Sequence, residues 1–310
     1  MRGKACLMVS STTISLVDRR AAVAGIGLMT AGIFMFAVND AMGKWLVATY
    51  SVGQLLLVRS IAALILLVPF IWRDRATFAR APRWGMQTLR AVLATAEVGC
   101  FYWAVSYLPL ADVMSYYLAG PIFVTAIAGA FLGEAVGWRR WSAVAVGFVG
   151  VVVCLRPGSA ALSWPALIAL AGSLTFSLSM ISTRTLRGTS DTVLVTSQTV
   201  AALIFGAVLS PASWVTPSMR DLVLLALLGM VAMIAHVCVN RSLKLAPAST
   251  VVPYQYTTIV WAVLFGYLVF GDWPDAFMLA GAAIIIGAGL FIFLRERQLA
   301  RRASFSEPPP

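Results

Sequence analysis

Charged residues are scarce in this chain of 310 residues, where they make up 11 % of the sequence against 60 % for hydrophobic residues. Soluble domains usually carry about 25 % charged and about 45 to 50 % apolar residues, so the composition excludes an ordinary soluble fold. Long polar stretches are equally few, and the longest lie at the two ends, in residues 1–20 and 295–310. The sequence therefore leaves no room for a soluble domain of any size.

Metal ligands and nucleotide-binding motifs are also lacking. The single histidine is His236, and the four cysteines show no paired spacing. A metal site needs several such ligands, so we predict no metal, no cofactor and no disulfide framework. No glycine-rich segment ends in GKS or GKT, which argues against ATP as the energy source. A membrane-embedded lipid-modifying enzyme is a poor alternative, because it would need clustered carboxylates, histidines or a nucleophile with its base.

Ten apolar segments fill the rest of the chain. A hydrocarbon core of about 30 Å takes about 20 residues to cross as a helix, and lipid offers no partner for backbone polar groups, so spanning segments of this kind are helical. We therefore predict an all-α polytopic membrane protein. The ten expected spans are 21–40, 52–72, 84–106, 109–132, 139–156, 163–183, 191–210, 219–240, 247–270 and 276–294.

Basic residues give these spans a direction. The net charge is +11, but the basic residues are divided among alternate connecting segments instead of forming one face for nucleic acid, which we exclude as a partner. If the N-terminus is inside, 18 of the 23 Lys and Arg lie on the inner side, as the positive-inside rule requires. We expect both termini in the cytoplasm, with 1–20 as a cytoplasmic segment without a removable signal peptide and 295–310 as a disordered tail.

The two halves of the chain resemble each other. Residues 109–134 align with 247–272 at an offset of 138, and the start of each half aligns at an offset of 140. The matches include Pro109 with Pro247, Tyr116 with Tyr254, Gly133 with Gly271, Glu134 with Asp272, and Lys44 with Arg184. Each copy has five spans, an odd number, so the second copy enters the membrane from the opposite side. We predict a 5+5 inverted repeat of residues 21–156 and 157–294, an architecture that recurs in secondary transporters with the substrate site between the halves.

Three features resemble the EamA-type branch of the drug/metabolite transporter superfamily: the polar end of the first span, Asn39 to Lys44; Arg59 in the second; and Gly133-Glu134 closing the fourth. The resemblance covers about residues 21 to 294 and implies a multi-pass transporter of the bacterial inner membrane, with a small metabolite and the lipid bilayer as partners. A homodimer stays open. Residues 39–60 are similar to bacterial riboflavin uptake proteins, so riboflavin uptake is the first expectation. Other branches import or export amino acids, S-adenosylmethionine or drugs.

Ionisable groups inside the membrane are costly and mark candidate sites. Arg59 and Glu97 are expected at one depth, either as a structural ion pair or as groups that bind or gate a solute. At an offset of 139 they align with Gln198 and His236, which we expect towards the opposite mouth of a common cavity. His236 alternatively packs between helices.

Two more groups of residues are candidates for binding or gating. Asn39 and Asp40 lie near the outer end of the first span, where Asp40 and Lys44 share a helix face at i and i+4. Aromatic patches recur in both halves and would suit an aromatic substrate, although packing is the alternative. Their members are Tyr116, Tyr117, Tyr254, Gln255 and Tyr256.

Overall fold

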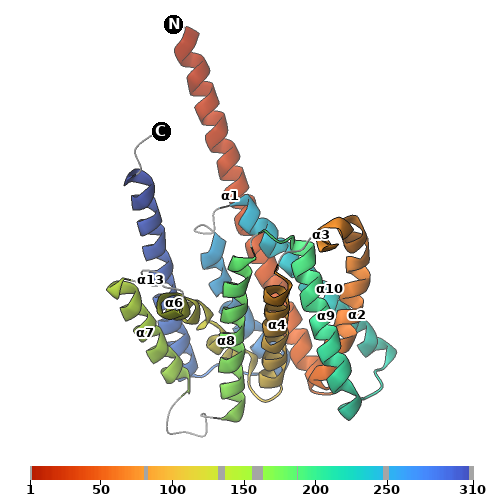
Figure 1. Ribbon diagram of the computed structural model, residues 1–310. Helices are drawn as coiled ribbons and strands as arrows, with labels where there is room; N and C mark the ends of the chain where they lie inside the picture. The colour runs from red at the N-terminus through yellow and green to blue at the C-terminus, as the bar shows by residue number, and fades with distance from the viewer. Residues whose placement is uncertain are drawn as a thin grey trace.

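The computed structural model describes residues 2–79, 83–131, 137–155, 163–186, 188–246 and 251–306. These residues form helices joined by short connections, with no strand in the described ranges (Figure 1). Eight of the helices are long and apolar enough to cross a membrane, and 254–270 is a shorter apolar helix. The α4 helix, with 22 residues, is long enough but carries more polar side chains. The predicted all-α polytopic class is confirmed.

The described residues of the first half form seven helices, and a serine cap marks where the second of these helices begins. Ser51 precedes α2 and its side chain accepts a hydrogen bond from the Gln54 amide (3.3 Å), as an N-cap serine does. The helices are α1 (Arg2–Val47), α2 (Val52–Arg73), α3 (Arg75–Ala79), α4 (Trp84–Val105), α5 (Leu110–Tyr117), α6 (Gly120–Phe131) and α7 (Trp138–Leu155).

The second half repeats this order. Ser190 caps α9 through the Val193 amide (3.3 Å), so α9 begins in the same way as its counterpart α2, 139 residues earlier. The helices are α8 (Trp164–Thr185), α9 (Asp191–Leu209), η1 (Ser210–Ser213), α10 (Met219–Leu245), η2 (Val252–Thr257), α12 (Thr258–Phe270) and α13 (Ala276–Ser306).

The fourth and ninth spans, expected at 109–132 and 247–270, are interrupted near Pro121 and Pro253. The fourth divides into α5 and α6 at residues 118–119, just before Pro121. The ninth begins as the 3-10 helix η2, which contains Pro253, and continues as α12. Proline has no N–H to donate and ends a regular helix. Interrupted helices at corresponding positions in two halves are typical of secondary transporters.

Helix packing follows the repeat. Across the halves, α1 packs mainly on α10, α4 on α8, α2 on α9, and α7 on α13. Exchanging each helix for its counterpart in the other half turns the α1 and α10 pair into the α8 and α4 pair and leaves the other pairings unchanged. Such a set of contacts is that of a pseudo-two-fold arrangement, which agrees with the predicted inverted repeat.

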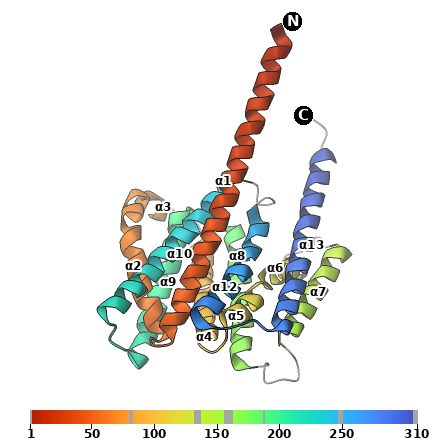
Figure 2. The same cartoon turned by 180° about the vertical axis from the view of Figure 1, so that it is seen from behind.

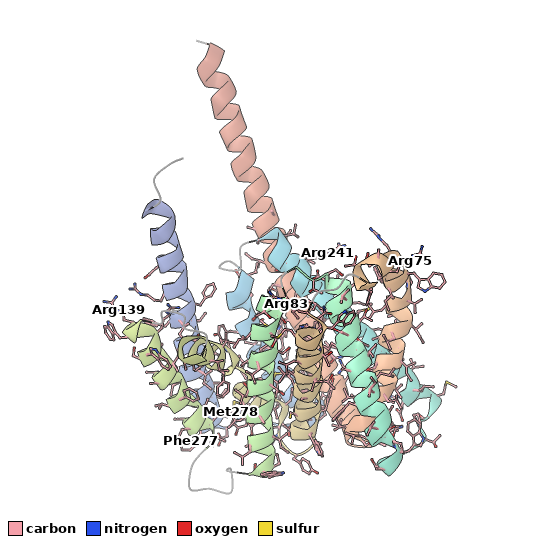
Figure 3. All side chains as sticks on the ribbon, in the orientation of Figure 1. Arg75, Arg83, Arg139, Arg241, Phe277 and Met278 are labelled. Atoms are coloured by element: carbon pink, nitrogen blue, oxygen red, sulfur yellow. The ribbon has the colours of Figure 1, made fainter. Side chains whose placement is uncertain are left out.

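Both termini emerge at the same end of the bundle (Figures 1 and 2). Arg75, Arg83, Arg139 and Arg241 gather at that end, whereas Phe277 and Met278 lie towards the other (Figure 3). The C-terminal segment differs from the expected disordered tail, because α13 continues as helix to Ser306. Its sequence is rich in helix formers, and Arg295 donates a hydrogen bond to Gln298 one turn later (3.1 Å). Residues 2–20 likewise belong to α1.

Glycines let α7 and α13 approach closely. A Cβ atom on Gly281 would lie 2.7 Å from the Gly150 carbonyl oxygen and would overlap the Cys154 thiol. A Cβ atom on Gly287, in the same helix, would meet nothing within 4 Å. Small residues at helix interfaces allow this packing in membranes, where helix association depends on close contact.

Gly281→Ala is therefore expected to lower stability by about 1 to 3 kcal/mol through overpacking. Thermal unfolding of the purified protein in detergent measures the change. Gly287→Ala is the matched control, and we expect its melting temperature to stay at or slightly above that of the unmodified protein. Equal effects of the two substitutions would show that the α7 and α13 contact is not the tight one.

Candidate functional site

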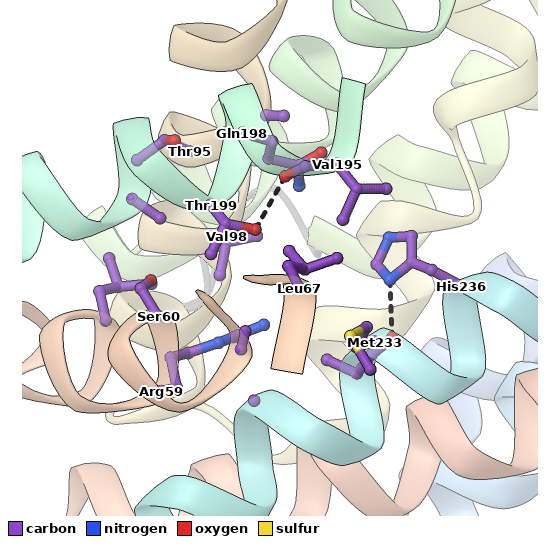
Figure 4. Close-up of a pocket in the computed structure, with 16 residues that line it drawn as sticks. Arg59, Ser60, Leu67, Thr95, Val98, Val195, Gln198, Thr199, Met233 and His236 are labelled. Carbon is purple, nitrogen blue, oxygen red and sulfur yellow. Dashed lines mark hydrogen bonds between the residues drawn. The ribbon is translucent and has the colours of Figure 1, made fainter. Parts of the chain in front are cut away.

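A cavity of about 60 Å³ lies between α2, α4, α9 and α10 (Figure 4). These helices are two pairs of counterparts, α2 with α9 and α4 with α10, so the cavity lies on the pseudo-two-fold axis. Its residues fall near the middle of each helix. The polar lining residues are Arg59, Ser60, Thr95, Gln198, Thr199 and His236.

Three predicted site residues therefore line one cavity. Arg59, Gln198 and His236 come from different helices and both halves, although Gln198 and His236 were expected at the opposite mouth from Arg59. Glu97, which was predicted beside Arg59 at this site, is not among the residues that line the cavity. His236 Nδ1 lies 2.8 Å from the Ala232 carbonyl oxygen of its own helix, and the Phe36 ring packs edge-on against the imidazole at 4.7 Å.

The Arg59 guanidinium is held by a chain of hydrogen bonds. Arg59 Nη1 donates to the Tyr102 hydroxyl (3.0 Å), and that hydroxyl donates to Asn39 Oδ1 (3.0 Å). Asn39 Nδ2 donates to the Leu228 carbonyl oxygen (2.6 Å). Arg59 also stands 5.5 Å from the centre of the Tyr102 ring, within range of a cation–π interaction.

Two carboxylates lie near this arginine without bonding to it. Asp40 and Glu97 are close enough to interact electrostatically with each other and with Arg59, but neither has a nitrogen–oxygen contact with Arg59 within 4.0 Å. The structural ion pair between Arg59 and Glu97, one of the two readings from the sequence, is therefore not formed. The backbone carbonyl oxygen of Glu97 accepts a hydrogen bond from the Tyr117 hydroxyl (3.0 Å).

Lys44 bonds across the halves and not to Asp40, the neighbour on its helix face. Lys44 Nζ contacts Asp272 Oδ2 at 2.6 Å and stands 4.6 Å from the centre of the Phe270 ring. This ion pair lies at the end of the bundle opposite the termini. In the repeat alignment the counterpart of Asp272 is Glu134. Gly133 and Glu134 lie outside the described residues.

The two aromatic patches do not converge on the cavity. Tyr116 is buried, with its hydroxyl 3.5 Å from the Cys154 carbonyl oxygen, and Tyr256 packs its hydroxyl against Gly289. Tyr254 is 37 % exposed and Gln255 is half-buried. Among the described residues that line the cavity, none belongs to either patch. Helix packing, the alternative from the sequence, describes Tyr116, Tyr117 and Tyr256 in this conformation.

The site is built for hydrogen bonding and charge. No cluster of three or more His, Cys, Asp and Glu suited to a metal occurs among the described residues. The cavity instead presents a guanidinium, an amide, an imidazole and hydroxyl groups. Such groups bind a polar organic molecule and fix its orientation.

Comparison with known proteins decides the family. The model of the EamA-like transporter family matches residues 23–156 and again 163–294. The chain belongs to the EamA-like transporter family. It is a multi-pass membrane transporter and not an enzyme.

Relatives of this EamA-like transporter match it over nearly their full length. A riboflavin transporter of Rhizobium johnstonii is 27 % identical over 95 % of this chain and 98 % of its own. An S-adenosylmethionine uptake transporter of Rickettsia felis is 26 % identical over 91 % and 97 %. A solved crystal structure shares the fold, with a TM-score of 0.61 and 15 % identity over 91 % of this chain and 99 % of its own.

Tyr102 is the main site residue that the sequence did not reveal. Tyr102 lies five residues after Glu97 in the same span, at a depth near that of Arg59. A tyrosine hydroxyl at the depth of a buried arginine is the signal that could have identified it. Thr95, which lines the cavity, was missed as well. Its buried hydroxyl has no hydrogen-bond partner in the described structure.

The Lys44 and Asp272 pair can be tested by charge exchange. With side chains 13 % and 30 % exposed, the pair is expected to contribute about 1 kcal/mol. Lys44→Ala and Asp272→Ala should each lower the melting temperature by a few degrees. The reversed pair, Lys44→Asp with Asp272→Lys, should recover most of the loss, whereas a reversed pair no better than the single variants would show that the two charges do not interact.

Proposed function

We propose that this transporter takes up a small, polar organic metabolite by alternating access, and that riboflavin is the first candidate substrate. The observation that carries the proposal is the cavity on the pseudo-two-fold axis, lined by Arg59, Gln198 and His236 from both halves. Substrate sites of inverted-repeat transporters lie at this point, where rocking of one half against the other exposes them to each side in turn.

The small size of the cavity supports a mechanism in which the two halves move relative to each other. At about 60 Å³ it holds a few water molecules, whereas sites for small organic molecules occupy about 300 to 1,000 Å³. A metabolite enters only when the halves separate at one end. The Lys44 and Asp272 ion pair joins the halves at the end opposite the termini, so it opens when that end admits substrate.

Riboflavin fits the donors of the site. Its ring system carries carbonyl oxygens and ring nitrogens in one plane, and the Arg59 guanidinium presents N–H donors in a planar fork. The Gln198 amide can donate and accept at the opposite wall. The relative from Rhizobium johnstonii supports this substrate, in agreement with the similarity of residues 39–60.

S-adenosylmethionine is the second candidate, and a specific observation favours it. Asp40 and Glu97 lie near Arg59, although neither lines the cavity in this conformation, and they form no ion pair with it in the described structure. A substrate with both cationic groups and a carboxylate would complement two acids and one arginine. The Rickettsia felis relative transports this compound.

We further propose the bacterial inner membrane as the location, with both termini in the cytoplasm. The support is the positive-inside distribution, together with the arginines gathered at the end where the termini emerge (Figure 3). In this orientation the Lys44 and Asp272 pair faces outwards. The moving units are the two repeats, residues 21–156 and 157–294.

Arg59→Ala and Glu97→Gln are expected to abolish transport, because one removes the guanidinium of the cavity and the other removes an acidic group beside it. Uptake of labelled riboflavin and, separately, S-adenosylmethionine into proteoliposomes measures the effect. Normal membrane insertion and a normal elution profile in detergent must accompany the loss.

Leu279→Ala is a matched control, since Leu279 is a 44 % exposed residue of α13 away from the cavity. It should transport at the rate of the unmodified protein. Retention of uptake in Arg59→Ala would remove the cavity as the substrate site. Failure of the unmodified protein to support growth of a riboflavin auxotroph, despite confirmed expression, would remove riboflavin as the substrate.

A further inference from the structure

Arg59 is connected to α10 through two residues that the sequence does not link to it. The side-chain route runs from Arg59 to Tyr102, then to Asn39, and ends on the Leu228 carbonyl oxygen of α10. These four groups come from α2, α4, α1 and α10 in turn. The route therefore starts at a cavity residue of the first half and ends on the backbone of the second.

The middle of the route is rigid. Tyr102 is 1 % exposed and is one of the largest fully buried side chains. Its ring lies against Gly43 of α1, where any Cβ atom would overlap the ring carbons. Asn39 is 3 % exposed. With ring and amide packed on all sides, the Tyr102 hydroxyl has a fixed position, and so does the nitrogen of Arg59 that bonds to it.

The backbone of Arg59 meets the same turn of α10. Gly229, the residue after Leu228, faces the Arg59 carbonyl oxygen so closely that an added Cβ atom would overlap it. Two consecutive residues of α10 therefore contact Arg59, Gly229 directly at the backbone and Leu228 through Asn39 and Tyr102. A shift of α10 relative to the first half moves both contacts.

We infer that Tyr102 and Asn39 are positioning residues, which aim the Arg59 guanidinium into the cavity and tie its position to α10 of the opposite half. The inference rests on the proposed function, because it assumes that Arg59 binds the substrate. Arg59 has five N–H donors, and the Tyr102 hydroxyl takes one of them. The bond to Tyr102 sets the direction in which the others point.

The first test compares substrate affinity with maximal rate. Tyr102→Phe keeps the ring and its packing but removes the hydroxyl, so Arg59 loses its anchor. Because hydrogen bonds to charged groups are among the stronger ones, we expect KM for the transported probe, riboflavin or S-adenosylmethionine, to rise about 10-fold or more. The maximal rate should change less than twofold. Asn39→Ala, which breaks the route one step further on, should raise KM in the same way.

Combined variants distinguish positioning from general damage. Tyr102 and Asn39 act one after the other in the same route, so Tyr102→Phe and Asn39→Ala together should raise KM no further than either substitution alone. In an Arg59→Lys background, where the planar fork is gone, Tyr102→Phe should leave KM unchanged. Multiplicative effects in either combination would overturn the inference, since they would show that Tyr102 acts independently of Asn39 in the first combination or of Arg59 in the second.

Ser242→Ala is the matched control. Ser242 Oγ donates to the Gly25 carbonyl oxygen (2.6 Å), a buried side-chain-to-backbone bond between the same two helices, α10 and α1. Its loss should lower the melting temperature but leave KM within twofold. A KM increase equal to that of Tyr102→Phe would show that any weakening of the α1 and α10 contact has this effect, which overturns the inference.

The outcome separates the two proposals. If the unmodified protein transports a probe and Tyr102→Phe leaves KM unchanged, the positioning role is wrong and the proposed function stands. If the unmodified protein binds and transports neither probe, the proposed function fails for both substrates, and the inference fails with it.

Discussion

The hydrocarbon of a bilayer accepts no hydrogen bonds, and this constraint arranges the polar groups of the chain. Backbone groups satisfy each other within helices, so the chain is all-helical. Polar side chains then find hydrogen-bond partners between helices. Asn39, Tyr102 and Arg59 bond to one another and to the backbone of α10, which concentrates polar chemistry where the two halves meet. The same arrangement of side chains satisfies the buried polar groups and forms a polar site at the centre of the bundle.

Much of the fold could be predicted because it depends on local composition. Apolar length locates the spans, and an odd number of spans in each copy determines the inversion. The breaks in spans four and nine were harder to predict, because hydropathy alone does not locate an interruption inside a span. Pro121 and Pro253 mark them, but proline does not say whether a helix kinks or ends. The helical extension to Ser306 was missed because a short polar tail resembles a disordered one, whereas its helix formers simply continue α13.

The site could be predicted in part, because polar groups inside membrane spans are rare and therefore stand out in the sequence. Ionisable and polar groups inside spans identified Arg59, Gln198 and His236, and the cavity contains all three. Their partners depend on packing between distant segments. Lys44 could pair with Asp40 one turn away, yet it bonds to Asp272 across 228 positions of sequence, because the second half brings that carboxylate to the end of α1. Tyr102 becomes relevant only when α4 is set beside α1 and α2.

The bonds of α1 to the second half lie at three levels. Ser242 bonds to Gly25 near the end where the termini emerge, Lys44 bonds to Asp272 at the far end, and Asn39 bonds to Leu228 between these two levels. When two rigid halves rock about a central pivot, contacts at the two ends lengthen in turn, whereas a contact near the pivot changes least. The middle level is the one that leads to Arg59. Under the proposed rocking motion, a binding residue attached at this intermediate level would keep its anchor for more of the cycle than one attached at either end.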